Sequence, residues 1–168
     1  MGPTAAARDL RDRMFWRRLL RAGLLTGILD GLFSSALVVF AYGSSVERLW
    51  QGVAAVLLGG SALDGGIRTA AIGLALHFGV AFAWSAAFVL AALRVPWVRR
   101  TLTPPSPLGV AEIAALYGPF VWLAMSLAVI PLFTQRPPTI GFRWWVQLLG
   151  HIPFVGVPIV AASVTRPR

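Results

Sequence analysis

The sequence predicts an all-α integral membrane protein, a bundle of four transmembrane helices with a short interfacial or re-entrant helix between the first two. Of its 168 residues, 57% are hydrophobic and only 12% are charged, and the mean hydropathy is +0.74. A soluble domain has about 25% charged residues, so lipid must cover the apolar surface of this chain. Four apolar stretches also reach the roughly 20 residues that a membrane-spanning helix requires.

The sequence predicts one transmembrane domain, 22–164, with spans at about 22–42, 67–93, 110–133 and 144–164. A basic leader, residues 1–21, precedes this domain, and a short tail, residues 165–168, follows it. From Leu10 the leader favours a short amphipathic helix with its arginines among the lipid headgroups. A signal peptide is the competing interpretation of the first span, but its apolar run of about 21 residues exceeds the usual 7–15.

The segment between the first two spans, 43–66, predicts a helix that does not cross the membrane. Its apolar part, Val46–Leu58, covers only about 13 residues, which is too short for a span. Gly59 and Gly60 are expected to end this helix, and a glycine-rich turn at Asp64–Gly66 leads into the second span. We therefore expect the helix to lie at the membrane surface or to enter the bilayer only partly.

The distribution of arginines predicts the orientation. With the N-terminus in the cytoplasm, eleven of the fifteen arginines lie in cytoplasmic segments and four lie outside: Arg48, Arg68, Arg136 and Arg143. This excess predicts that both termini are cytoplasmic. Trp50, Trp144 and Trp145 are then expected to anchor the chain at the outer interface, and Trp16 and Trp97 at the inner one. Because the charge lies in tails and loops, anionic lipid is the expected partner and nucleic acid is not.

Three ionisable residues inside the predicted spans are the candidates for function. Asp30 lies about nine residues into the first span, near the midplane, where a carboxylate costs at least about 2.5–3.5 kcal/mol. Such an acid belongs either to a proton relay or substrate site, or to a hydrogen bond that joins helices. His77 and His151 are expected within about 5 Å of the same depth. Asp30 is expected about 8 Å deeper than His77, so direct contact requires helix tilt or a water molecule.

The two histidines allow several interpretations. They meet across the bundle as part of a ligand site, a proton path or a pair of haem ligands, or they pack separately against carbonyl or hydroxyl groups. Without cysteine, thiolate metal sites and iron–sulfur clusters are excluded. The motifs HExxH, GxxxxGK[ST] and GxSxG are also absent. The sequence therefore predicts no catalytic residues and no metal site.

The fourth span contains an unusual segment, GHIPFVGVP, at Gly150–Pro158. Pro153 removes the helical donor to the carbonyl of Leu149, and Pro158 does the same for Phe154. Such carbonyls bind cations or polar ligands where they line a cavity. The alternative is a kinked helix whose small residues allow close packing.

Four segments together resemble a family of small, uncharacterised bacterial inner-membrane proteins: GLLTGILDG, LLGGSALDGGIRTAAIGLALHF, YGPFVWLAMSLAVIPL and GHIPFVGVPIV. The resemblance covers about residues 22–163. It implies a four-span fold in a bacterial inner membrane, but no activity. The family's acid, LDGG turn and two histidines correspond to Asp30, Asp64–Gly66, His77 and His151.

For function, we expect a non-enzymatic membrane protein, a structural or accessory subunit that packs with lipids, with other membrane proteins or with copies of itself. The first alternative is a small oligomeric transporter or proton-coupled channel whose polar path contains Asp30, His77 and His151. The second alternative is a protein that binds haem b with His77 and His151 as axial ligands. No other cofactor is expected.

Overall fold

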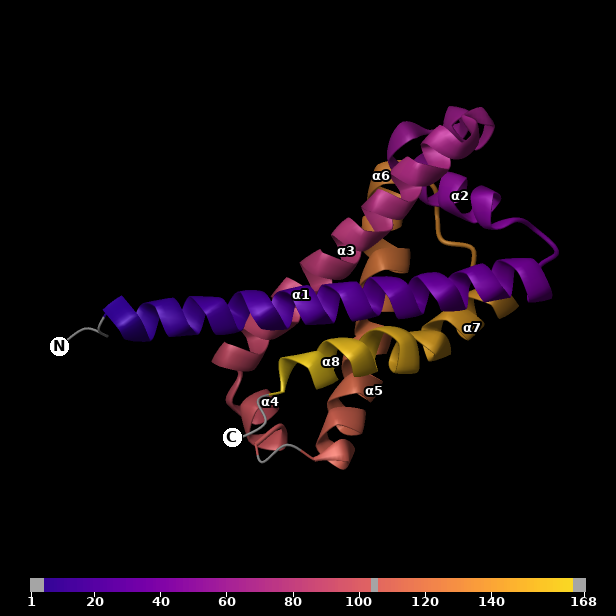
Figure 1. Cartoon of the computed structure of the whole chain (residues 1–168). Helices are drawn as coiled ribbons and strands as arrows, with labels where there is room; N and C mark the ends of the chain where they lie inside the picture. Colours follow the sequence, from indigo (N-terminus) through magenta and orange to yellow (C-terminus); the bar gives the residue numbers. More distant parts are fainter. Residues whose placement is uncertain (1–4, 104–105, 165–168) are drawn as a thin grey trace.

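The computed structural model describes residues 5–103 and 106–164 (Figure 1). Within these ranges the chain forms helices and no strand. Four of the described helical segments are long and apolar enough to cross a membrane: Asp12–Ala41, Gly66–Ala92, Pro107–Thr134 and Phe142–Ser163. The predicted all-α fold class is therefore confirmed, and the protein is a multi-pass membrane protein. Only 17–39% of the residues in an apolar 18-residue stretch of each segment are buried, as expected for helices whose outer faces contact lipid.

The first span is part of a longer helix. Helix α1 runs from Ala5 to Ala36 and continues as a π-helical turn, η1, over Leu37–Ala41. The leader is therefore not a separate amphipathic helix, because its described part is continuous with the span. Its first four residues, like the predicted tail, lie outside the described residues.

The short helix after the first span is confirmed at the predicted residues. Helix α2 covers Val46–Leu58; the side chain of Ser45 accepts a hydrogen bond from the Arg48 N–H at its start, and Gly59 ends it with a φ of 77°. A 3₁₀ turn, η2, follows at Gly60–Asp64. Helix α2 packs very closely on the next span, since a Cβ atom at Gly73 would overlap the backbone carbonyl of Trp50.

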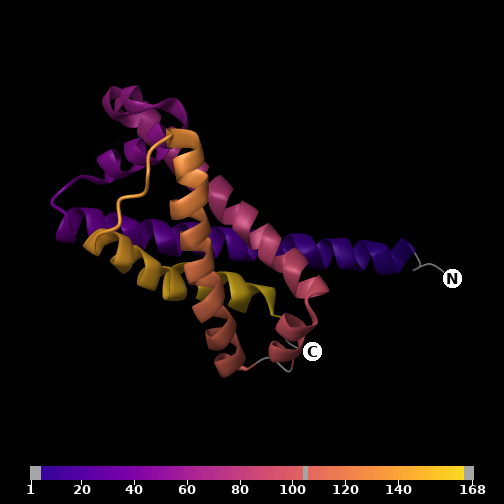
Figure 2. The ribbon, with the colours of Figure 1, turned by 180° about the vertical axis from the view of Figure 1, so that it is seen from behind.

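The remaining chain contains these helices: α3 (Gly66–Arg94), α4 (Pro96–Thr101), α5 (Pro107–Ala124), η3 (Met125–Val129), α6 (Ile130–Thr134), α7 (Phe142–His151), η4 (Ile152–Gly156) and α8 (Val157–Ser163). Figure 1 shows α7 and α8 alongside the C-terminal part of α1, whereas α3 and α5–α6 cross them. The view from behind shows the same arrangement (Figure 2).

The two ends of the bundle differ. Helix α2 and the loop 135–141 lie at one end, which we name the α2 end. Helix α4, the start of α5 and the end of α8 lie at the other, the terminal end. The hydrophobic core fills the terminal end, with these buried members: Phe88, Val98, Leu102, Ile113, Ala114, Val121, Val155, Ile159 and Val160.

The prolines of the fourth span produce a π-helical turn. Pro153 lies in η4, and the N–H of Ile152 donates to the carbonyl of Leu149. The prediction that Leu149 presents a free carbonyl is therefore wrong, because the tighter turn before Pro153 supplies a donor. The small residues do allow close packing: a Cβ atom at Gly156 would overlap the carbonyl of Ala114 in α5.

The tryptophans divide into exposed and buried groups. Trp16, Trp97 and Trp145 are about half exposed, as an interfacial anchor requires, whereas Trp50 and Trp144 are each only 8% exposed. Other parts of the chain cover Trp50 and Trp144, and their placement at the outer interface stays a prediction. Trp144 also donates a hydrogen bond of 3.1 Å to the hydroxyl of Ser126.

Candidate functional site

A stripe of glycines on α1 brings the second span close to it. Gly23, Gly27 and Gly31 lie one helical turn apart, and a Cβ atom at Gly27 would overlap the ring of Phe78 in α3. A Cβ atom at Gly31 would lie 3.4 Å from Nε2 of His77. Because these positions have no side chain, α3 approaches the α1 backbone, and His77 lies directly against it.

His77 has defined neighbours on three sides. Its Nε2 lies 2.9 Å from the carbonyl oxygen of Gly27, and its ring centroid lies 5.1 Å from that of Trp50. Its Nδ1 lies 3.9 Å from Oδ2 of Asp30. Trp50 comes from α2, so the short helix covers this imidazole. The side chains of His77 and Asp30 are each 14% exposed.

Asp30 interacts electrostatically with both His77 and His151. The structure therefore brings together the three residues that the sequence singled out. The Oδ1 atom of Asp30 is buried and has no hydrogen-bond partner among the described residues. An acid that only joins helices would use its oxygen atoms in hydrogen bonds, so this unpaired oxygen needs another explanation.

His151 is fixed from two helices. Its Nδ1 lies 2.7 Å from the carbonyl oxygen of Gln147, one turn earlier in α7, and its ring centroid lies 4.9 Å from that of Trp122 in α5. Gly118 in α5 lies against the His151 backbone, since a Cβ atom there would overlap the His151 carbonyl. His151 is buried and has little freedom to move away from Asp30.

The hydrogen bonds assign the protons on both imidazoles. A carbonyl oxygen only accepts, so Nε2 of His77 donates to Gly27 and Nδ1 of His151 donates to Gln147. The nitrogens that remain to bind a further proton are Nδ1 of His77 and Nε2 of His151. Together with the Asp30 carboxyl they form a group of acceptors with no assigned donor. The 3.9 Å between Nδ1 of His77 and Oδ2 of Asp30 is too long for a hydrogen bond, so proton transfer between them would require a bridging water molecule or a small movement.

The contacts do not fit a haem. Axial ligation requires both imidazoles to face one iron across an open slot for the porphyrin. Here Nδ1 of His77, the nitrogen that is not bound to a carbonyl, lies 3.9 Å from Oδ2 of Asp30, and Trp50 packs on the same imidazole. Within 5–103 and 106–164, no group of three or more His, Cys, Asp or Glu side chains is arranged to hold a metal ion.

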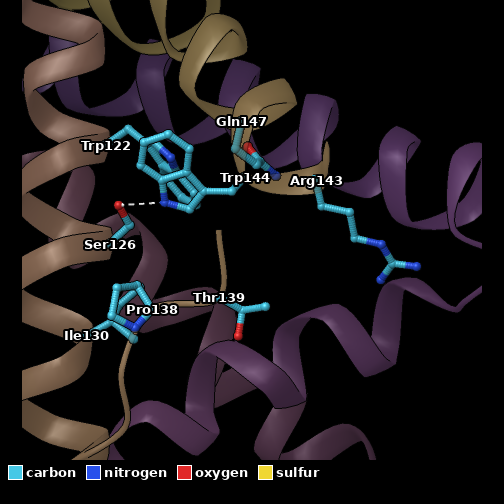
Figure 3. Close-up of a pocket in the computed structure, with 8 residues that line it drawn as sticks. All are labelled: Trp122, Ser126, Ile130, Pro138, Thr139, Arg143, Trp144 and Gln147. Carbon is cyan, nitrogen blue, oxygen red and sulfur yellow. Dashed lines mark hydrogen bonds between the residues drawn. The ribbon is translucent and has the colours of Figure 1, made fainter. Parts of the chain in front are cut away.

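An open pocket of about 260 Å³ lies at the α2 end (Figure 3). Its lining residues come from α5–α6, the loop 135–141 and α7: Trp122, Ser126, Ile130, Pro138, Thr139, Arg143, Trp144 and Gln147. Two of them contact His151, through the Trp122 ring and the Gln147 carbonyl. We define Asp30, His77 and His151 as the acid–imidazole cluster. Trp122 and Gln147 therefore lie between the pocket and this cluster.

The sequence contained a signal for this pocket that its analysis missed. Tryptophan prefers the membrane interface, yet Trp122 lies in the middle of the third predicted span. Gln147 is an uncharged polar residue inside the fourth span, four positions before His151. Both side chains have a buried polar atom without a partner in the described part of the chain, Nε1 of Trp122 and Oε1 of Gln147.

Comparison of the chain with protein-family models, curated proteins and solved structures finds no match. The chemistry of the site is therefore inferred from its own residues.

Proposed function

We propose that the protein moves protons in a bacterial inner membrane, with the acid–imidazole cluster as its proton-binding site. The observation that carries this proposal is the buried, unpartnered Oδ1 of Asp30 beside two imidazoles that each keep one nitrogen free. An intramembrane carboxyl with basic partners is the usual construction of a proton relay. Hydrogen bonds to backbone carbonyls fix the tautomers and leave the second proton to be exchanged.

The predicted orientation determines which side of the membrane the α2 end faces. The arginine excess supports cytoplasmic termini, which places the α2 end outside. The pocket then faces the outer solution, and Trp122 and Gln147 connect it to His151. On this arrangement protons enter the cluster from outside.

A flux assay tests the proposal. We expect proteoliposomes containing the protein to acidify when the external pH is lowered, as measured with a trapped pH-sensitive dye. Asp30→Asn keeps the size of the side chain but removes its titration, so the protein-dependent rate should fall at least about a hundredfold. Asp64→Asn is the matched control, because Asp64 is exposed at the α2 end. Equal rates for wild type and Asp30→Asn would exclude the proposal.

A second function, packing with other membrane helices, is favoured by the outer face of α3. Ala75, Gly79 and Ala83 are exposed one turn apart and line an open hollow of about 420 Å³ with larger residues beside them. Small residues at this spacing allow helix backbones to approach in a bilayer. An accessory subunit, or a homo-oligomer, would bury this face. Self-association would also give a four-span chain the additional helices that a proton path needs.

We expect Gly79→Leu to abolish self-association, because a leucine would fill the hollow of α3 and hold a second helix away. The measurement is cross-linking in native membranes followed by size analysis in mild detergent. Gly52→Leu is the control, since Gly52 lies in α2 and also has open space around it. A wild-type protein that is monomeric and without partners in both experiments would contradict this second function.

A further inference from the structure

Helix α4 lies at the terminal end of the bundle and is held there by its apolar side chains (Figure 1). The chain leaves α3 at Val95, which has an extended backbone, and α4 begins at Pro96. Val98 and Leu102, one helical turn apart, are both buried in the hydrophobic core. This packing fixes the orientation of α4, so the residues on its other side face outward.

The outward side of α4, with the last residue of α3, carries three arginines and a tryptophan. Arg94, Arg99 and Arg100 are exposed, and Trp97 is 49% exposed. We name these four residues the α4 patch. Guanidinium groups bind phosphate through paired hydrogen bonds, and tryptophan prefers the headgroup level of a bilayer. The patch therefore combines two side-chain types that suit a phospholipid headgroup.

No carboxylate neutralises the α4 patch within the described residues. The acid–base pairs found there are Asp9 with Arg13 and Asp30 with His77, and neither includes an arginine of the patch. The next acidic residue along the chain, Glu112 in α5, is exposed and forms no ion pair in the same ranges. Three neighbouring cations without a counter-ion produce a positive potential that attracts anions.

The arginines of the opposite end differ in this respect. Arg48 donates a hydrogen bond of 2.7 Å to the carbonyl of Leu63, and the Arg143 guanidinium lies over the ring of Tyr42. These contacts occupy the two cations within the protein itself. No such contact involves an arginine of the α4 patch in the described part of the chain, so the patch remains available to an external anion.

The N-terminal part of α1 adds cations at the same end. Along the glycine stripe α1 and α3 run in opposite directions, so the residues of α1 before Gly23 lie toward the end of α3 that leads into α4. Among them Arg17 and Arg21 are exposed, as is Trp16. Two separate parts of the chain therefore present arginine and tryptophan together at the terminal end.

We propose that the α4 patch binds the headgroup of an anionic phospholipid, whose phosphate oxygens accept hydrogen bonds from the arginines. The occupant is a lipid and not a soluble phosphate, because the patch lies at the end of a membrane span. Leu90 in α3 and Val95 directly after it are exposed and offer an apolar surface to the acyl chains beside the bound headgroup. A zwitterionic lipid fits less well, since its ammonium group would meet the same arginines.

Binding is tested on the full-length, delipidated protein in detergent by native mass spectrometry, with phosphatidylglycerol and phosphatidylcholine of identical acyl chains as probes. We expect phosphatidylglycerol to bind at least about tenfold more tightly. The triple variant Arg94→Gln, Arg99→Gln and Arg100→Gln should weaken phosphatidylglycerol binding by at least about tenfold and leave phosphatidylcholine binding unchanged. Arg68→Gln combined with Arg136→Gln is the control, because both arginines are exposed and lie outside the patch.

Equal binding of the two lipids by the wild type, or unchanged binding by the triple variant, would overturn the lipid site. Full displacement of phosphatidylglycerol by inorganic phosphate would also overturn it, because the patch would then recognise a soluble anion. An equal loss of binding in the control variant would indicate a general charge effect and count against the site. Circular dichroism of each variant excludes loss of folding as the cause. None of these assays depends on proton movement, so the lipid site and the proton function can fail separately.

Discussion

Replacing Asp30 by valine is expected to stabilise the folded protein by about 2 kcal/mol while proton movement is lost. The side chain of Asp30 is 14% exposed, its Oδ1 has no partner in the described ranges, and its Oδ2 lies 3.9 Å from Nδ1 of His77. The side chain therefore loses hydration without gaining hydrogen bonds of equal strength. Valine is similar in size and has no polar atoms to bury.

The sign of this change separates two roles of Asp30, proton transfer and the joining of helices. An acid kept for proton transfer reduces stability, as residues at functional sites often do. An acid that joins helices would increase it, so its removal would lower the free energy of unfolding. The measurement is thermal unfolding in one detergent at fixed pH. His77→Phe provides the contrast, because it removes the hydrogen bond to Gly27 and should destabilise the protein.

Gly118→Ala is expected to destabilise the protein by about 3 kcal/mol. The added Cβ atom would overlap the carbonyl of His151, where α5 crosses the start of η4. The Cβ position is fixed by the backbone of α5, and the carbonyl belongs to the backbone of His151. Rotation of a side chain therefore cannot relieve the clash, and the two helices must separate. His151 would then move relative to Asp30, and proton flux should fall with stability.

Gly52→Ala is the matched control for this substitution. Gly52 is also helical, but beyond its chain neighbours and the adjacent backbone of its own helix no atom lies within 4 Å of the position its Cβ would occupy. Alanine there should stabilise the protein by about 0.5–1 kcal/mol, because it favours the helical state more than glycine does. Opposite signs for the two variants, measured by thermal unfolding in the same detergent, would confirm the close contact at Gly118. Equal effects would contradict it.

The spans and the short helix could be predicted because they depend on local properties. Apolar length determines which segments cross a bilayer, and Val46–Leu58 is bounded by residues that begin and end helices in any context. The continuity of the leader with the first span was harder to predict, because no proline or glycine pattern distinguishes two helices from one continuous helix. Burial of Trp50 and Trp144 depends on how α2 and α7 pack, which a single sequence does not contain.

The role of Asp30, His77 and His151 stays a prediction, whereas the proximity of Asp30 and His77 was expected only for tilted helices. Counting residues along each span predicts that Asp30 is about 8 Å deeper than His77, whereas the structure places their side chains 3.9 Å apart. The count assumes parallel helices. Here α3 crosses α1 at the glycine stripe, so residues at different positions along their spans come into contact (Figure 1).

The continuity of α1 has a consequence for the choice of lipid. The apolar part of its membrane segment, Ala22–Ala41, extends about 30 Å and matches the hydrocarbon layer, whereas Arg13, Arg17, Arg18 and Arg21 precede it in the same helix. Longer acyl chains exceed this apolar length and favour a more upright α1, and shorter chains favour a more tilted one. Because α1 carries Asp30 and the fourth span carries His151, such a change of inclination alters the separation of the two residues.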